Sequence, residues 1–175
     1  MRQIAIRTMR AWEYNLLKNF VYEAIYVPPG SASLPKSITD RPELQVYFHR
    51  FGCGRWDKAF VALDGERIVG AIWCRLMDDY GHVDDETPSL AMALYQEYRG
   101  CGIGTTLLRT MLGALKREGA RQVSLSVQKE NRAASLYRRE GFWTLWETEE
   151  EYIMINDLRR EKSTPVTSGD SVYVG

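Results

Sequence analysis

The sequence predicts an α/β (α+β) domain in which helices pack on a mixed sheet. Three observations lead to this prediction: a hairpin signal over residues 58–77, a short apolar run that leads into a glycine-rich stretch, and two helical patterns after it. Three strands follow one another in the middle of the chain instead of alternating with helices. This order disfavours a purely doubly wound sheet.

The first 51 residues predict one strand and two helices. Alternating isoleucines indicate a strand over residues 4–10, and an apolar stripe from Trp12 to Ala24 indicates an amphipathic helix. Residues 27–41 contain three prolines and three serines, which is typical of a long connection, and loops of this length are often functional. A second, short helix is expected over residues 44–51.

A β-hairpin is predicted over residues 58–77. The Asp64-Gly65 pair separates its two apolar runs and supplies the positive backbone torsions that a tight reversal needs. Residues 78–88 contain five acidic side chains and are expected to form a solvated loop. After this loop, Leu90 to Tyr95 is a short apolar run bounded by turn signals, which predicts a buried central strand.

The second half of the chain predicts two helices and three strands. An apolar face from Leu107 to Leu115 indicates a helix that ends at Gly119, a natural left-handed cap. Asn131 is suited to cap the next helix, and Gly141 followed by Phe142 predicts a Schellman-type end. The remaining expected elements are a helix over 132–140 and strands over 123–127, 142–147 and 152–155.

Composition excludes several classes of function. The chain has 175 residues, and one domain is predicted over 1–158, followed by a mobile tail over 159–175. Its 23 basic and 23 acidic residues balance, which argues against binding of nucleic acid or an anionic membrane. Three cysteines without CxxC spacing and two histidines near none of them predict free thiols and no metal site. No membrane span or signal peptide is recognised, so a cytoplasmic location is expected.

The most informative stretch lies between the predicted central strand and the next helix. Arg99 can add charge at its rim, and Gly100, Gly102 and Gly104 alternate before Thr105. Glycines let the backbone approach a ligand closely, and the free amides at a helix start carry partial positive charge, so this pattern indicates phosphate or pyrophosphate binding. It matches neither a Walker loop nor the GxGxxG of a Rossmann fold. The alternative is a glycine-rich turn that only joins a strand to a helix.

The stretch resembles the pyrophosphate loop of the GNAT superfamily of acyl-CoA N-acyltransferases, with Arg99, Gly102 and Gly104 in the family's positions. A second family motif is an asparagine followed by a helix that ends in Leu-Tyr and is closed by Gly-Phe. Its residues here are Asn131, Ala133, Leu136, Tyr137, Gly141 and Phe142. The resemblance covers roughly residues 60–157 and implies a GNAT-like, mostly antiparallel sheet of about six to seven strands, flanked by about four helices.

The resemblance implies acetyl-CoA as cosubstrate and a primary amine of a small molecule or peptide as acceptor; a homodimer is left open. The residues implied in cofactor binding are Leu94, Arg99, Gly100, Cys101, Gly102, Ile103, Gly104, Thr105 and Asn131. Leu94 would offer strand-edge backbone to the pantetheine, and the loop amides would bind the pyrophosphate. Tyr137 would act at the sulfur, although core packing explains its spacing equally well. Likewise, an N-cap accounts fully for Asn131.

The expected reaction is direct attack of a neutral amine on the thioester. Tyr137 would stabilise the leaving thiolate mainly by a hydrogen bond, because proton transfer from an ordinary phenol to a thiolate is uphill by about 2 kcal/mol. Some relatives place a glutamate base five positions before the asparagine, and that position is Ser126 here, so no base carries over. Glutamates 147, 149, 150 and 151 cluster at the final hairpin, which in the resembling family borders the acceptor side; the alternative is that this turn is acidic simply because it is solvated. A noncatalytic acyl-CoA-binding sensor is the alternative function.

Overall fold

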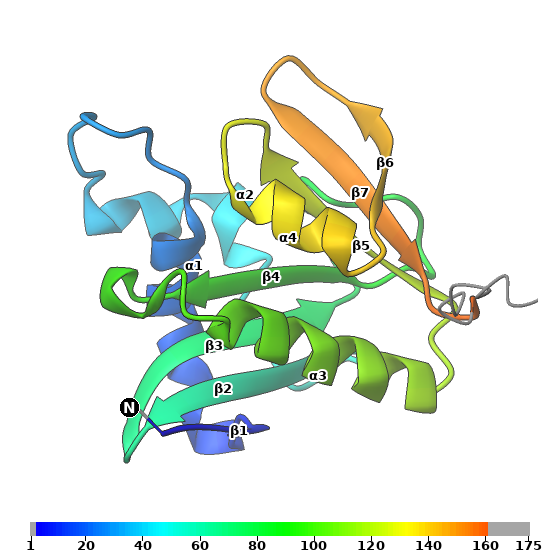
Figure 1. The fold of residues 1–175 in the computed structure, drawn as a ribbon, viewed down its shortest axis with the longest axis horizontal. Helices are drawn as coiled ribbons and strands as arrows, with labels where there is room; N and C mark the ends of the chain where they lie inside the picture. Colours follow the sequence, from blue (N-terminus) through cyan, green and yellow to red (C-terminus); the bar gives the residue numbers. More distant parts are fainter. Residues whose placement is uncertain (1–2, 161–175) are drawn as a thin grey trace, which may run out of the picture.

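The computed structural model describes residues 3–160, which form one mixed sheet with helices on both faces (Figure 1). The strands are β1 Ile4–Thr8, β2 Lys58–Asp64, β3 Arg67–Arg75, β4 Ser89–Leu94, β5 Gln122–Gln128, β6 Trp143–Glu147 and β7 Glu151–Asp157. The helices are α1 Leu17–Ala24, α2 Pro42–Gln45, α3 Ile103–Arg117 and α4 Ala133–Arg139, with 3₁₀ turns η1 Ala11–Leu16, η2 Lys36–Asp40 and η3 Gln96–Tyr98. The predicted mobile tail falls almost entirely on residues 161–175, which lie outside the described residues.

The strand order is β1-β2-β3-β4-β5-β7-β6, and every neighbouring pair is antiparallel except β4 with β5. This topology confirms the mixed, mostly antiparallel sheet flanked by four helices. β4 is the middle strand, as its apolar run predicts. Within residues 3–160, no helix is both long and apolar enough to cross a membrane.

Two apolar layers hold the helices to the sheet. On one face, Leu107 and Leu115 of α3 are completely buried, and on the other face Phe20 of α1 is buried. β3 contributes to both layers because successive strand residues point to opposite faces. Ile72 belongs to the α3 layer and Trp73 to the α1 layer, and neither is exposed. Each such side chain contributes roughly 2 kcal/mol by its burial.

The N-terminal helix differs from the predicted one. Its first part, Ala11–Leu16, is the 3₁₀ turn η1, and only Leu17–Ala24 is α-helical. A 3₁₀ helix has about three residues per turn instead of 3.6, which breaks the predicted stripe and leaves Trp12 74% exposed. The connection predicted over 27–41 contains η2, and the second helix is the short α2, followed by turns.

The predicted hairpin forms, with its turn one residue later than the sequence indicates. Asp64 pairs with Arg67, so the two turn residues are Gly65 and Glu66. Gly65 has a φ of +60°, a conformation that glycine adopts without steric cost.

The prediction of a solvated acidic loop over residues 78–88 is wrong in part. The carboxylates of residues 84–86 belong to exposed residues, as expected. Gly81, Thr87 and Pro88 are buried, because the chain folds back onto the sheet before it enters β4. This return places Asp79, from the same acidic run, next to the central strands.

Candidate active site

β4 and β5 are parallel neighbours that meet at one point. Their ladder consists of Ser89 opposite Ser124, and the Ser124 N–H donates to Pro88 O at 3.0 Å. Beyond this pair the strands diverge toward their C-terminal ends (Figure 1). The facing strand edges there carry backbone groups without a strand partner, so the opening can accept an extended ligand.

The glycine loop lies at the C-terminal end of β4. Gly100 and Gly102 have φ values of +72° and +81°, and a Cβ at either position would meet no atom within 4 Å. α3 begins at Ile103, and the Thr106 N–H donates to Gly102 O at 3.2 Å to close its first turn. The three N–H groups from Ile103 onward precede that bond, so they can bind an anion.

Gly104 contributes mainly to packing. This residue is buried, and a Cβ there would lie 3.4 Å from Met92 Cε and 3.5 Å from Leu136 Cδ2. The start of α3 therefore lies close to both β4 and α4. The glycine loop is thereby held next to the helix that contains Tyr137.

Arg99 makes contacts that the sequence does not indicate. Its Nε donates to Leu94 O at 3.0 Å, and its Nη2 donates to Glu23 O at 3.2 Å. The guanidinium therefore ties the loop to the end of β4 and to α1, besides adding charge at the rim. Because the Tyr95 N–H donates to Val69 O on β3, the Leu94 backbone faces the opposite edge, toward the opening.

Tyr137 lies in α4 and is only 6% exposed. Its ring packs edge-on against Phe142, with 5.7 Å between the centroids, and burial raises the pKa of its phenol to about 12. Gly141, with a φ of +98°, lets the Phe142 N–H donate to Tyr137 O, which confirms the predicted Schellman-type end. Asn131 Oδ1 accepts from the Ala133 N–H at 2.9 Å, as a helix-capping side chain does.

Two carboxylates lie near the same opening: Glu151, one of the hairpin glutamates expected on the acceptor side, and Asp79, which was not predicted. Asp79 Oδ1 is buried and has no hydrogen-bond partner among the described residues, and burial raises the pKa of this carboxyl. Burial also raises the pKa of Tyr47, with the Asp79 charge as the next largest cause. Glu151 begins β7, and its pKa is raised by burial first and then by the charges of Glu150 and Asp79.

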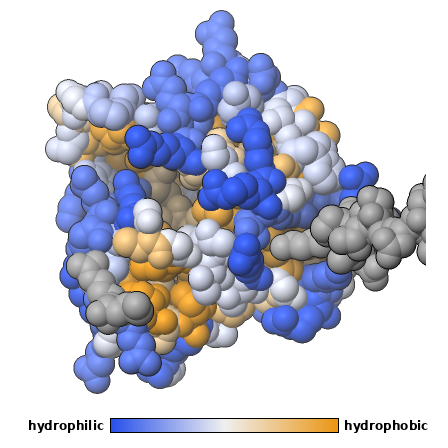
Figure 2. Space-filling model, viewed as in Figure 1, coloured by the Kyte–Doolittle hydropathy of each residue, from blue (hydrophilic) through white to orange (hydrophobic). Residues whose placement is uncertain are grey.

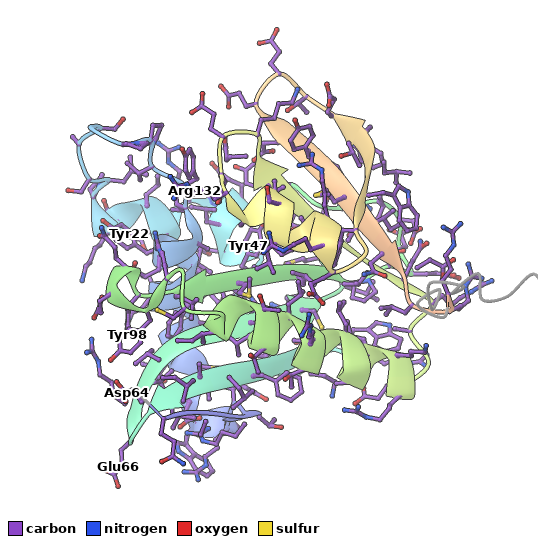
Figure 3. The ribbon with its side chains drawn as sticks, in the orientation of Figure 1. Tyr22, Tyr47, Asp64, Glu66, Tyr98 and Arg132 are labelled. Atoms are coloured by element: carbon purple, nitrogen blue, oxygen red, sulfur yellow. The ribbon has the colours of Figure 1, made fainter. Side chains whose placement is uncertain are left out.

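The surface around this opening is hollowed. Figure 2 shows a hollow between the segment that follows α1 and the start of α4. Tyr22 and Tyr47 lie on the α1 and α2 side of it, and Arg132 lies at the start of α4 (Figure 3). Two separate cavities, of 360 and 220 Å³, adjoin residues 76–78 after β3, and neither is lined by the glycine loop.

The divided central sheet, the free amides at the start of α3 and the adjacent Tyr137 match the acyl-CoA N-acyltransferase class that the sequence resembles. The chain belongs to the acetyltransferase (GNAT) family, whose sequence model matches residues 22–142.

Curated relatives match the chain over part of their length. N-alpha-acetyltransferase 30 of Schizosaccharomyces pombe is 36% identical over 98 residues, which cover 55% of this chain and 65% of that protein. Mycothiol acetyltransferase of Geodermatophilus obscurus is 36% identical over 89 residues, 47% of this chain and 28% of that protein. The ribosomal protein bS18-alanine N-acetyltransferase of Haemophilus influenzae is 31% identical over 80 residues, 46% of this chain and 51% of that protein.

Solved structures share the fold. The ribosomal-protein-S18-alanine N-acetyltransferase of Escherichia coli superposes with a TM-score of 0.61 at 16% identity, covering 98% of this chain and 100% of that chain. The PaiA N-acetyltransferase of Thermoplasma acidophilum, in complex with coenzyme A, gives a TM-score of 0.63 at 19% identity, covering 89% and 99% of the two chains. At these identities the likeness concerns the fold alone.

Proposed function

We propose that the protein transfers an acetyl group from acetyl-CoA to a primary amine by direct attack on the thioester. The observation behind this proposal is the convergence of the free amides of α3, the opening between β4 and β5, and Tyr137. Family membership and the names of the relatives support it. A noncatalytic acyl-CoA-binding sensor would use the same loop without needing an acceptor cleft.

The proposed roles follow the geometry. The backbone amides from Gly100 to Thr105 bind the pyrophosphate, and the outward edge of Leu94 binds the pantetheine. The Tyr137 hydroxyl donates a hydrogen bond to the departing thiolate. The exposed thiol of Cys101, whose Sγ lies 3.5 Å from Arg99 O, takes no covalent part, because direct transfer needs no acyl-enzyme. Asn131 serves the site by holding the start of α4.

The first acceptor to test is a peptide with a free N-terminal amine. Two of the relatives are named for acetylation of α-amines or of an alanine of a ribosomal protein. At pH 7 an α-amine is about 10 to 17% neutral, whereas a lysine amine is about 0.04% neutral. Deprotonation thus costs about 1 kcal/mol for the former and about 4.6 kcal/mol for the latter. The cytoplasmic location and the homodimer stay predictions from the sequence.

Binding of acetyl-CoA can be tested with a pair of matched glycine variants. Gly102 and Gly119 lie at the two ends of α3, both have φ above +80°, and a Cβ at either would meet open space. Gly102→Val and Gly119→Val should therefore lose similar stability. Calorimetry should show at least tenfold weaker binding of acetyl-CoA for Gly102→Val only. Equal affinities in both variants would remove the glycine loop from the cofactor site. Release of free thiol with a panel of peptides and small amines then distinguishes an enzyme from a sensor.

A further inference from the structure

The segment after β3 packs against β5 near the point where β4 and β5 are paired, at the narrow end of the gap between them. A Cβ on Gly81 would lie 2.9 Å from Leu125 C and from Ser126 N, so only glycine fits against the β5 backbone there. Gly81 O also accepts from Ser124 Oγ at 2.7 Å. These contacts hold Asp79, two residues earlier, beside the point where β4 and β5 meet.

The Asp79 carboxylate has few groups to stabilise its charge. The hydroxyls of Ser89 and Tyr47 and the backbone of Gly81 are close enough to favour its charged form, but none of them satisfies the buried Oδ1. Burying a carboxylate with an open acceptor position costs stability unless a ligand completes it. Asp79 as a whole is partly exposed, so a positively charged donor can approach its carboxylate.

The sheet face beside Asp79 is lined by small side chains. Ser89 Oγ and Ser124 Oγ are 3.2 Å apart, so they share a face, and Ser126 lies on that face two residues further along β5. The serines of β5 supply no carboxylate on this face, and the neighbouring loop that contains Asp79 supplies one from the side.

The geometry points to Asp79 as the carboxylate that receives the proton of the acceptor ammonium, with Tyr47 and Ser89 as positioning residues. This inference rests on the proposed function. The acceptor ammonium gives one proton to Asp79, and the freed nitrogen lone pair forms the bond to the thioester carbonyl carbon. The carbon–sulfur bond breaks with its electron pair on sulfur, and a second proton from nitrogen ends on that sulfur. The products are an amide and free CoA, and Asp79 then releases its proton to solvent.

Glu151 is the other carboxylate that faces this region, and its position is less suitable. It pairs with Gln128 in the sheet, at the open end of β5, and its Oε1 accepts from Gln128 Nε2 at 3.3 Å. Its exposure and its partner suit it to attract the acceptor. Asp79 lies deeper and retains an open acceptor position.

The titratable groups that interact with Asp79 are Tyr47 after α2 and Glu151 on β7. Tyr80 in the same loop interacts with Tyr47, Glu151, Glu43 and Arg41. Burial raises the pKa of Asp79 above its ordinary value, which brings this base closer to neutral pH. Activity should therefore fall on the acid side as Asp79 becomes protonated.

The decisive variant is Asp79→Asn, with Asp78→Asn as its control, because Asp78 is the exposed acidic neighbour in the same loop. The probes are acetyl-CoA and a panel of short peptides with free α-amines, with free thiol as the readout. We expect Asp79→Asn to lower kcat/KM by about 6- to 10-fold at pH 7, because only about 10 to 17% of the α-amine is neutral there without a base, while acetyl-CoA affinity stays unchanged. The deficit should shrink as pH passes the amine pKa of about 8, where the neutral amine needs no base. Asp78→Asn should match the wild type.

Two further measurements separate a catalytic role from a structural one. Asp79→Asn removes a buried charge, so its Tm should rise at neutral pH, whereas loss of a structural group would lower it. Because the pKa of Asp79 is raised in the folded protein, its charge lowers stability only at pH values above the ordinary carboxyl pKa. The gain in Tm of Asp79→Asn should therefore vanish near pH 3. Tyr47→Phe removes a group that lowers the pKa of Asp79, so the acid limb of the activity profile should move to higher pH.

The possible failures are distinguishable. If the wild type releases CoA with a peptide but Asp79→Asn keeps its rate and its acid limb, the role of Asp79 is overturned and the acetyltransferase function stands. A lower Tm in Asp79→Asn together with an unmoved profile in Tyr47→Phe would also overturn it. If the wild type binds acetyl-CoA and releases no CoA with any amine, the proposed function fails, and this inference fails with it.

Discussion

Tyr137 packs in the core, as one interpretation of the sequence predicts, and its action at the sulfur stays a prediction. Its ring is part of the apolar layer under α3, and its backbone carbonyl closes the end of α4. With a pKa of about 12, transfer of its proton to a thiolate would be uphill by about 5 kcal/mol. The hydroxyl is therefore better suited to donate a hydrogen bond than to give up its proton.

Tyr137→Phe should lower kcat by about 10- to 100-fold and leave the affinity for acetyl-CoA nearly unchanged. The reason is that the hydroxyl interacts with charge that develops only as the thiolate leaves. Steady-state kinetics with the best amine of the panel, together with calorimetry, measures both quantities. Tyr14→Phe is the matched control, because Tyr14 packs against Phe51 in the other apolar layer. A change confined to KM would contradict a role in the transition state.

At the scale of elements, local signals were sufficient for the glycine loop and for α4. Gly102 and Gly141 adopt the positive φ that their motifs require, and Asn131 caps its helix. Asp79 could not be found in this way. Its surroundings depend on the packing of Gly81 against β5, which lies more than 40 residues later in the chain. The acidic run around Asp79 is typical of a solvent-exposed loop. A glycine inside an acidic run was the one available hint of close packing.

The same limit explains the N-terminal helix. Helical periodicity assumes 3.6 residues per turn, but residues 11–16 form a 3₁₀ turn. In this turn the Glu13 carboxylate accepts hydrogen bonds from Arg7 of β1. Arg7 Nη1 and Nη2 donate to the two Glu13 oxygens at 2.7 Å, and the Arg10 N–H donates to Glu13 Oε2 at 2.8 Å. This ion pair joins β1 to the 3₁₀ turn, and helical periodicity does not reveal it.

Glu13→Gln should therefore destabilise the junction between β1 and η1. The Arg7 hydrogen bonds lower the pKa of Glu13 to about 2, so its stabilisation is complete above the ordinary carboxyl pKa and disappears as pH falls toward 2. We expect a loss of about 1 kcal/mol in the free energy of unfolding at pH 7, shrinking to none near pH 2. Urea unfolding at the two pH values measures the difference. Asp40→Asn breaks the exposed Lys18–Asp40 pair and should cost little at either pH.

At the scale of the whole molecule, the divided sheet connects two faces that otherwise have separate cores. Tyr137 belongs to the layer under α3, whereas Tyr47 belongs to the layer under α1. The opening between β4 and β5 is where a ligand held by the glycine loop can meet a group that comes from the Asp79 side. Under the proposed function, cofactor and acceptor would bind on opposite sides of one gap, each to its own set of residues.

Acidic side chains gather at the β6–β7 turn beside this gap, while Arg132 adds a positive charge at the start of α4 (Figure 3). Glu149 and Glu150 are exposed in the turn between β6 and β7, and Glu151 and Asp79 lie nearer the opening. Glu147, the fourth glutamate of the hairpin, is paired with Lys129 Nζ at 3.1 Å, so it adds little to the field. A region lined by one sign of charge raises the local concentration of ligands of the opposite sign. We therefore expect a cationic acceptor amine to be steered toward the opening.

Steering predicts that kcat/KM for a cationic amine falls by about tenfold as ionic strength rises from 0.01 to 1 M, because the Debye length shortens from about 30 to about 3 Å. The triple variant Glu149→Gln, Glu150→Gln and Glu151→Gln should show a similarly low kcat/KM already at low salt, and its salt response should be nearly flat. Glu66→Gln removes a carboxylate from the distant β2–β3 turn (Figure 3) and should retain the wild-type salt response. If the triple variant instead matches the wild type at every ionic strength, the β6–β7 hairpin does not steer the acceptor, and Asp79 alone must account for its attraction.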